Sequence, residues 1–297
     1  MRLRLTVYDW RGAAPAGAVL IYEKGCDVML SPGEFVSFYA QAGAKKAANG
    51  ADRLAVSAVL AGFYIASGAV VSNTAGHLLT NAGLSRVLCG LLFPFGLIMV
   101  IVTGAELFTG NCMITISLLE KKASLAGMVR NLVIVYLGNL VGAVLLAAAI
   151  VYCGQLDLSG GALAVHTIRT AAAKCAIPFG KAVVMGILCN VLVCAGVMCS
   201  LCGKSLPGRA IGAFVPVSFF VIGGFEHCVA NMYYIPAGLL AARVPEYARL
   251  AQEAGVNLSL LNLGGFFTNL IPVTIGNIIG GCGFGALIWA AQRQKPN

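Results

Sequence analysis

Long apolar runs alternate with short polar connections along nearly the whole chain. About 20 apolar residues cross a bilayer as a helix, and six runs reach that length: 54–79, 86–119, 128–153, 179–202, 208–242 and 264–291. The second and fifth runs are too long for one straight span, and polar stretches interrupt them at 104–111 and 223–231. We therefore expect an all-α polytopic membrane protein with six transmembrane helices, of which the second and fifth are broken into half-helices.

The two polar interruptions share one internal spacing. Glu106 lies five residues before Asn111, and Glu226 lies five residues before Asn231. A charged side chain at the centre of a bilayer costs about 2.5–3.5 kcal/mol on insertion scales, and non-helical backbone at that depth needs cover from protein or a water-filled cavity. Paired broken segments of this kind are typical of transport sites. We expect these four residues to structure the two loops, with the carboxylates facing backbone amides.

A second matching motif extends the correspondence between the halves of the chain. Gly138–Gly142 reads GNLVG in the third apolar run, and Gly276–Gly280 reads GNIIG in the sixth. Three spans in each half place the halves in opposite orientations, which is the inverted-repeat plan of many transporters. The second half has a longer outer connection, about 243–262, with an amphipathic pattern.

Composition and charge agree with a membrane protein. Hydrophobic residues make up 59% of the chain and charged residues 10%, whereas soluble domains have about 25% charged residues. The net charge of +9 is explained by positively charged connections, so a nucleic-acid partner is not indicated. The connections on the side of both termini carry more Lys and Arg than the others, which predicts cytoplasmic termini. We expect a multi-pass protein of a prokaryotic inner membrane.

The N-terminal region has two parts. Ser31 and Glu34 form a capping-box pattern, and an amphipathic cytoplasmic helix is expected over 29–53, ahead of a channel domain over 54–297. Residues 1–28 show no helical or strand period. We interpret them as an extension that is disordered or untranslated, with Met29 as the working start; a short arm that gates the pore is the alternative.

An enzyme or redox role finds little support in the sequence. The eleven cysteines fall mostly within apolar runs, where a free thiol behaves as a small hydrophobe, and their spacing predicts neither a metal site nor a cofactor. A haem-bearing membrane anchor of a redox enzyme is the alternative class. It would need two histidines at membrane depth, and only His227 lies there, because His77 and His166 fall in outer connections.

Four stretches resemble the formate/nitrite transporter family: Gly104–Asn111, Gly224–Met232, Ile235–Gly238 and Ile271–Gly281. They occur in the family's order, and the resemblance covers 29–297. It implies an aquaporin-like fold, a homopentamer with one pore in each protomer, and transport of formate, nitrite, hydrosulfide or related small monovalent anions.

The resemblance also implies roles for individual residues. His227 matches the central pore histidine and Thr109 the threonine of an Ω-shaped loop. The expected pore residues are His227, Thr109, Asn190, Asn277 and Lys174, and the expected constrictions are Leu97, Leu107, Phe108, Phe93 and Phe220. Glu106 and Gly110 stand where some formate channels have aspartate and serine, so the motif does not identify the anion.

The chemistry of histidine suits a passing anion. Its unperturbed pKa of about 6.5 lies near working pH, so His227 can pair with the anion or protonate it, and a neutral species crosses apolar surroundings at lower cost than an ion. We expect formate as the substrate. Hydrosulfide, nitrite and short monocarboxylates remain alternatives, as does proton-coupled rather than passive transport.

Overall fold

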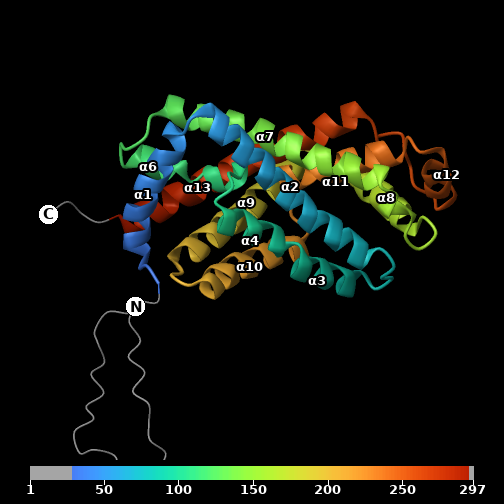
Figure 1. Cartoon of the computed structure of the whole chain (residues 1–297), viewed down its shortest axis with the longest axis horizontal. Helices are drawn as coiled ribbons and strands as arrows, with labels where there is room; N and C mark the ends of the chain where they lie inside the picture. Colours follow the sequence, from blue (N-terminus) through green and yellow to red (C-terminus); the bar gives the residue numbers. More distant parts are fainter. Residues whose placement is uncertain (1–28, 294–297) are drawn as a thin grey trace, which may run out of the picture.

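The computed structural model describes residues 29–293, and this part of the chain is helical (Figure 1). The residues assigned to an N-terminal extension, 1–28, lie outside it. The helices are α1 (Pro32–Ala48), α2 (Ala51–Gly76), α3 (Ala82–Leu92), α4 (Pro94–Thr103), α5 (Phe108–Asn111), α6 (Ile114–Leu119), α7 (Leu125–Tyr152), η1 (Gln155–Asp157), α8 (Ala162–Cys175), α9 (Phe179–Cys202), α10 (Leu206–Gly223), α11 (Cys228–Ala241), α12 (Pro245–Glu253) and α13 (Leu263–Gln292).

Within residues 29–293, six helical segments are long and apolar enough to cross a membrane, which confirms the six spans predicted from hydropathy. They are α2, α3 together with α4, α7, α9, α10 and α13. The expected cytoplasmic helix over 29–53 is shorter than predicted, because α1 ends at Ala48 and α2 already begins at Ala51. Its capping box is present: the Ser31 hydroxyl accepts from the Glu34 backbone N–H, and the Glu34 carboxylate accepts from the Ser31 backbone N–H.

The helices of the second and fifth apolar runs stop at glycine. Gly104 follows α4 with φ +69°, and Gly224 follows α10 with φ +71°. This left-handed conformation is the usual glycine end of a helix. Three further residues lead from each glycine to the start of a new helix, at Phe108 and at Cys228.

Two long helix pairs pack through glycine, so their backbones approach closely. In the α2–α7 pair, a Cβ placed on Gly142 would lie 2.0 Å from the carbonyl oxygen of Val59. In the α9–α13 pair, a Cβ on Gly280 would lie 2.3 Å from the carbonyl oxygen of Ile187. Each half of the chain therefore contains one pair that tolerates no side chain at its contact.

Short helices occupy the two ends of the molecule (Figure 1). Helix α1 lies beside α6 at the end where the described chain begins and ends, and α8 lies beside α12 at the opposite end. His166 lies, as expected, in the connection between the third and fourth spans, but this connection is helical, because it contains α8. The segment between the third and fourth spans was not predicted as helical because its mixed polar and alanine-rich pattern is weakly periodic.

Candidate functional site

The two interruptions meet at a single hydrogen bond. Thr109 Oγ1 lies 2.9 Å from His227 Nε2, and both residues are buried. His227 also caps α11, because its Nδ1 accepts from the backbone N–H of Ala230 at 3.1 Å. Since Nδ1 is an acceptor in this geometry, a neutral ring carries its hydrogen on Nε2 and donates it to the Thr109 hydroxyl.

A small chamber adjoins the His227 ring. Its volume is about 10 Å³, enough for about one water molecule. Phe220 stacks on His227 with ring centroids 5.8 Å apart, and Phe93 meets Phe220 edge-on at 5.7 Å. The chamber is lined by Ile65, Phe93, Leu97, Leu107, Val193, Val217, Phe220 and His227. Apart from the histidine, these side chains are hydrocarbon, so the chamber offers an ion little solvation.

One predicted constriction residue lies elsewhere. The family resemblance placed Phe108 at a constriction together with Leu107. It instead packs edge-on against Tyr136 of α7, with ring centroids 4.9 Å apart, and it does not line the chamber. The expectation was wrong because α5 begins at Phe108, and the first turn of the helix directs successive side chains to different faces.

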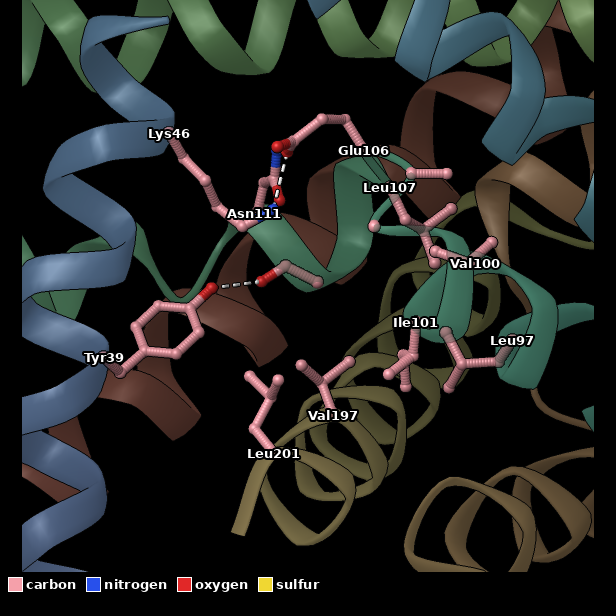
Figure 2. Close-up of a pocket in the computed structure, with 13 residues that line it drawn as sticks. Tyr39, Lys46, Leu97, Val100, Ile101, Glu106, Leu107, Asn111, Val197 and Leu201 are labelled. Atoms are coloured by element: carbon pink, nitrogen blue, oxygen red, sulfur yellow. Dashed lines mark hydrogen bonds and ion pairs between the residues drawn. The ribbon is translucent and has the colours of Figure 1, made fainter. Parts of the chain in front are cut away.

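A larger cavity opens on the α1 side of the chamber. It has a volume of about 280 Å³. Figure 2 shows Tyr39, Lys46, Glu106 and Asn111 on one wall and apolar side chains of α4 and α9 on the others. Its lining includes Leu97 and Leu107, which also line the chamber. These two leucines therefore separate the cavity from His227.

A buried ion pair joins α1 to the first loop. Lys46 Nζ lies 2.7 Å from Glu106 Oε2, and Asn111 Nδ2 donates to the same oxygen at 2.7 Å. Asn111 also donates to Asn131 Oδ1, whose own amide donates to the Lys46 carbonyl oxygen. The sequence analysis expected backbone amides around the carboxylate, which was wrong: the partners are side chains, and they neutralise the buried charge.

The second loop has the same network with other residues. Lys174 Nζ of α8 lies 2.8 Å from Glu226 Oε1. Asn231 Nδ2 donates to Glu226 Oε2 at 2.6 Å and to Asn269 Oδ1 at 2.7 Å, and Asn269 donates to the Lys174 carbonyl oxygen. The expectation of amide partners was wrong here for the same reason. Lys174 thus binds Glu226 directly, and its ammonium lies 5.1 Å from the centre of the Tyr234 ring.

Two asparagines hold the loop backbones in matching ways. Asn139 accepts from the Phe108 N–H at 2.9 Å and donates to the Ala58 and Glu106 carbonyl oxygens. Asn277 accepts from the Cys228 N–H at 2.9 Å and donates to the carbonyl oxygens of Gly186 and Glu226. Each loop therefore has its backbone groups satisfied by the long helix behind it, as buried backbone requires.

Asn190 and Asn277 lie behind the chamber rather than in its wall. Asn190 Nδ2 donates to the Thr109 carbonyl oxygen at 3.2 Å and to the Asn277 carbonyl oxygen at 2.6 Å. Both were predicted as pore residues, but neither lines the chamber. Their position shows that they hold the backbone that presents Thr109 and His227.

Three members of these networks were not predicted from the sequence: Lys46, Asn131 and Asn269. Asn139 was noted there only as part of the repeated glycine–asparagine motif. A signal for the two repeats was present, because Asn131 precedes Asn139 by the same eight residues that separate Asn269 from Asn277. Lys46 lies in the last turn of α1, where a cation already interacts favourably with the helix dipole. Extending the internal repeat to Lys46 and Lys174 would have identified both lysines together.

The comparisons with known proteins identify the family. The family model for the formate/nitrite transporter matches residues 33–291. The chain is 39% identical over 202 residues to the formate channel FocA of Haemophilus influenzae, covering 67% of this chain and 71% of that protein. It is 35% identical over 258 residues to the formate channel FocA of Escherichia coli K12, covering 85% and 90%.

A solved structure agrees with these matches. The fold resembles a pentameric formate channel with formate bound at a TM-score of 0.73 and 32% identity, covering 81% of this chain and 96% of that one. The fold and the loop networks define a multi-pass membrane transport protein. The chain belongs to the formate/nitrite transporter family.

Proposed function

We propose that this protein carries small monovalent anions, formate foremost, along a path that passes between the two loops. The observation that carries the proposal is the Thr109–His227 pair beside a narrow apolar chamber. Related proteins of similar length are named formate channels, which supports formate ahead of nitrite, hydrosulfide and short monocarboxylates. A transport role requires no catalytic residue or cofactor.

The path begins in the α1-side cavity. There Lys46 provides positive potential, reduced by its pairing with Glu106. The anion then passes Leu97 and Leu107, which exclude bulk water from the chamber. Weak attraction followed by an apolar barrier allows an ion to enter and to leave, as conduction requires.

Beside the chamber, the Thr109 hydroxyl that is hydrogen-bonded to His227 is the group that can donate to the anion. The neutral His227 ring donates to the Thr109 oxygen, which leaves the hydroxyl hydrogen free to be donated to an anion. Protonation of the anion by His227 requires the imidazolium form. In that form Nδ1 also carries a hydrogen and gives up its hydrogen bond from Ala230. We therefore propose hydrogen-bond donation through Thr109 as the resting mechanism, with proton transfer as the alternative.

The architecture extends the proposal to the assembled protein. Matching networks around Glu106 and Glu226 support two broken helices in halves of opposite orientation. We propose a homopentamer, in keeping with the pentameric relative. We further propose that both termini are cytoplasmic in a prokaryotic inner membrane, so that Lys46 lies on the cytoplasmic side and Lys174 on the outer side.

The decisive experiment is anion flux into liposomes that contain the purified protein. Formate, nitrite, hydrosulfide and acetate are compared with and without a pH gradient. His227→Asn should assemble normally but reduce formate flux about tenfold, equivalent to a barrier higher by about 1.4 kcal/mol, and should change its pH dependence. His166→Asn in α8 is the matched control. Wild-type flux and pH dependence in His227→Asn would remove this residue from the mechanism.

Two barrier residues test the path itself. Leu107→Ala and Phe220→Ala remove bulk on opposite sides of the chamber. Both should admit larger monocarboxylates such as propionate while leaving the half-saturation for formate little changed, because these side chains act as steric and dewetting barriers. Unchanged exclusion of propionate in both variants would contradict this path.

A further inference from the structure

Helix α2 leads from the chamber toward the α8 end of the molecule. Ile65 of α2 lines the chamber beside His227. Ala69 and Asn73 follow at intervals of four residues, so Ala69 lies about 40° and Asn73 about 80° from Ile65 around the helix axis, on the same side of α2. Eight residues of helix advance about 12 Å, and α2 runs toward the α8 end, where Thr74 hydrogen-bonds Gln155. Asn73 therefore lies past the Phe220 barrier, on the Lys174 side.

The other half of the molecule supports this placement. Ala58 of α2 and Gly186 of α9 occupy matching positions, because their carbonyl oxygens accept from Asn139 and Asn277 respectively. Counting seven residues onward from each reaches two chamber residues, Ile65 and Val193.

The correspondence between α2 and α9 also extends to a residue in the wall of the α1-side cavity. On α9, Val197 and Leu201 follow Val193 at intervals of four and line the α1-side cavity. Fifteen residues beyond Ala58 and Gly186, Asn73 corresponds to Leu201. A polar amide thus occupies, on the α8 side, the position that an apolar wall residue occupies on the α1 side.

The Asn73 amide is buried but unsatisfied. The residue is 6% exposed, and its Nδ2 has no hydrogen-bond partner among residues 29–293. The asparagines of the loop networks differ in this respect, since each donates to at least one protein oxygen, as Asn139 and Asn190 do. A buried donor without a partner is costly and needs an explanation. A transient ligand that accepts a hydrogen bond provides one.

We propose that Asn73 Nδ2 donates a hydrogen bond to the anion on the Lys174 side of the Phe93–Phe220 barrier, and that it favours oxyanions over hydrosulfide. This inference rests on the proposed function and deepens it. Carboxylate and nitrite oxygens are strong acceptors, whereas sulfur is a weak one. A neutral amide selects by hydrogen bonding without adding a charge that would trap the ion.

The test compares oxyanions with hydrosulfide in the same liposomes. Asn73→Leu installs the side chain found at the matching position of α9. The flux of formate and nitrite at subsaturating concentration should fall about three- to tenfold relative to hydrosulfide, as expected for loss of one hydrogen bond. Ser72→Ala is the matched control, because the Ser72 hydroxyl donates within α2 to the Gly68 carbonyl oxygen. It should keep the wild-type ratio.

Two safeguards make the result decisive. Oligomer size is measured for every variant, and Asn73→Ala replaces Asn73→Leu as the deciding variant if the leucine prevents assembly. An unchanged oxyanion-to-hydrosulfide ratio in the assembled variant would overturn this inference alone. Failure of the wild-type protein to carry any of the anions would instead overturn the proposed function.

Discussion

The two halves of the molecule share a supporting frame but differ where the loops meet. In both, a lysine on a short helix pairs with a loop glutamate, and asparagines complete the network. The residue after the glutamate is Leu107 in one half and His227 in the other, and two positions further on are Thr109 and Val229. The frame that holds each loop is therefore duplicated, whereas the residues that face the proposed path differ between the halves.

The supporting networks also differ in solvent exposure. The Lys46 side chain is 26% exposed and that of Lys174 is 16% exposed. The second half also has α12 and the residues that follow it before α13, at the α8 end of the molecule. Equivalent substitutions in the two halves remove the same ion pair at two degrees of solvent exposure. Comparing their effects on stability therefore shows how much of the loss depends on burial of the lysine.

The largest expected effect comes from Glu226→Ala. Removing one partner of a buried ion pair costs about 3–5 kcal/mol, and Glu226→Ala should approach this range, because the mostly enclosed Lys174 would lose its carboxylate. Thermal unfolding and oligomer size in detergent should show loss of the assembled protein. Glu106→Ala should be milder, since Lys46 has better access to solvent. Glu246→Ala, in an exposed pair with Arg249, is the control, and equal stability of all three variants would contradict the role of the frame.

Next in size are the glycine contacts of the helix pairs. Gly142→Ala and Gly280→Ala each direct a methyl group at a carbonyl oxygen of the partner helix. Overpacking of this kind costs about 1–3 kcal/mol, and the two halves should respond alike. Gly180→Ala in α9 meets no atom within 4 Å and should leave the unfolding temperature unchanged or slightly raised. A large difference between Gly142→Ala and Gly280→Ala would mean that the pairs are not equivalent.

The two loops should differ in how strongly formate flux depends on the residue three positions after the glutamate, which is Thr109 in the first loop and Val229 in the second. Thr109→Val gives the first loop the residue that the second loop has at Val229. It also removes the hydroxyl that is hydrogen-bonded to His227. One hydrogen bond contributes about 0.5–1.5 kcal/mol, so formate flux should fall severalfold without loss of assembly. Thr109→Ser retains the hydroxyl and should retain most of the flux. Equal flux through the valine and serine variants would show that the hydroxyl is not needed.

The smallest effect concerns the starts of the two lysine-bearing helices. Helix α1 begins with the Ser31 capping box, whereas α8 follows Gly161, which has no capping side chain. Ser31→Ala should destabilise the first turn of α1 by about 1 kcal/mol, seen as faster amide exchange there, and Ser31→Thr should restore protection.

The cap has a defined pH dependence. Hydrogen bonds from Ser31 lower the pKa of Glu34 below its usual value. The stabilisation by the ionised carboxylate is therefore complete at neutral pH and is lost as pH falls through that lowered pKa. Amide exchange that does not accelerate on acidification would contradict this assignment.

Hydropathy predicted the spans because length and apolar content alone determine them. The paired glutamates predicted the interruptions, since buried carboxylates are too costly to occur there by chance. The role of Lys46 could not be recognised from its position, because a lysine at a helix C-terminus already has a sufficient local explanation. Phe108 was misplaced because the direction of a side chain depends on the residue at which the short helix begins. The position of Asn190 behind the chamber depends on contacts between distant segments, which one sequence does not reveal.

The smallness of the chamber beside His227 has an electrical consequence. A space for about one water molecule interrupts any continuous column of water, so the protein is a dielectric barrier at that point and part of the membrane voltage falls across a few ångströms. The electrical energy of a bare anion changes by up to about 2.3 kcal/mol per 100 mV of membrane potential as it crosses this barrier. A neutral acid crosses the same barrier without electrical work. On the path that we propose, current and flux measured together therefore report the charge of the species that passes His227.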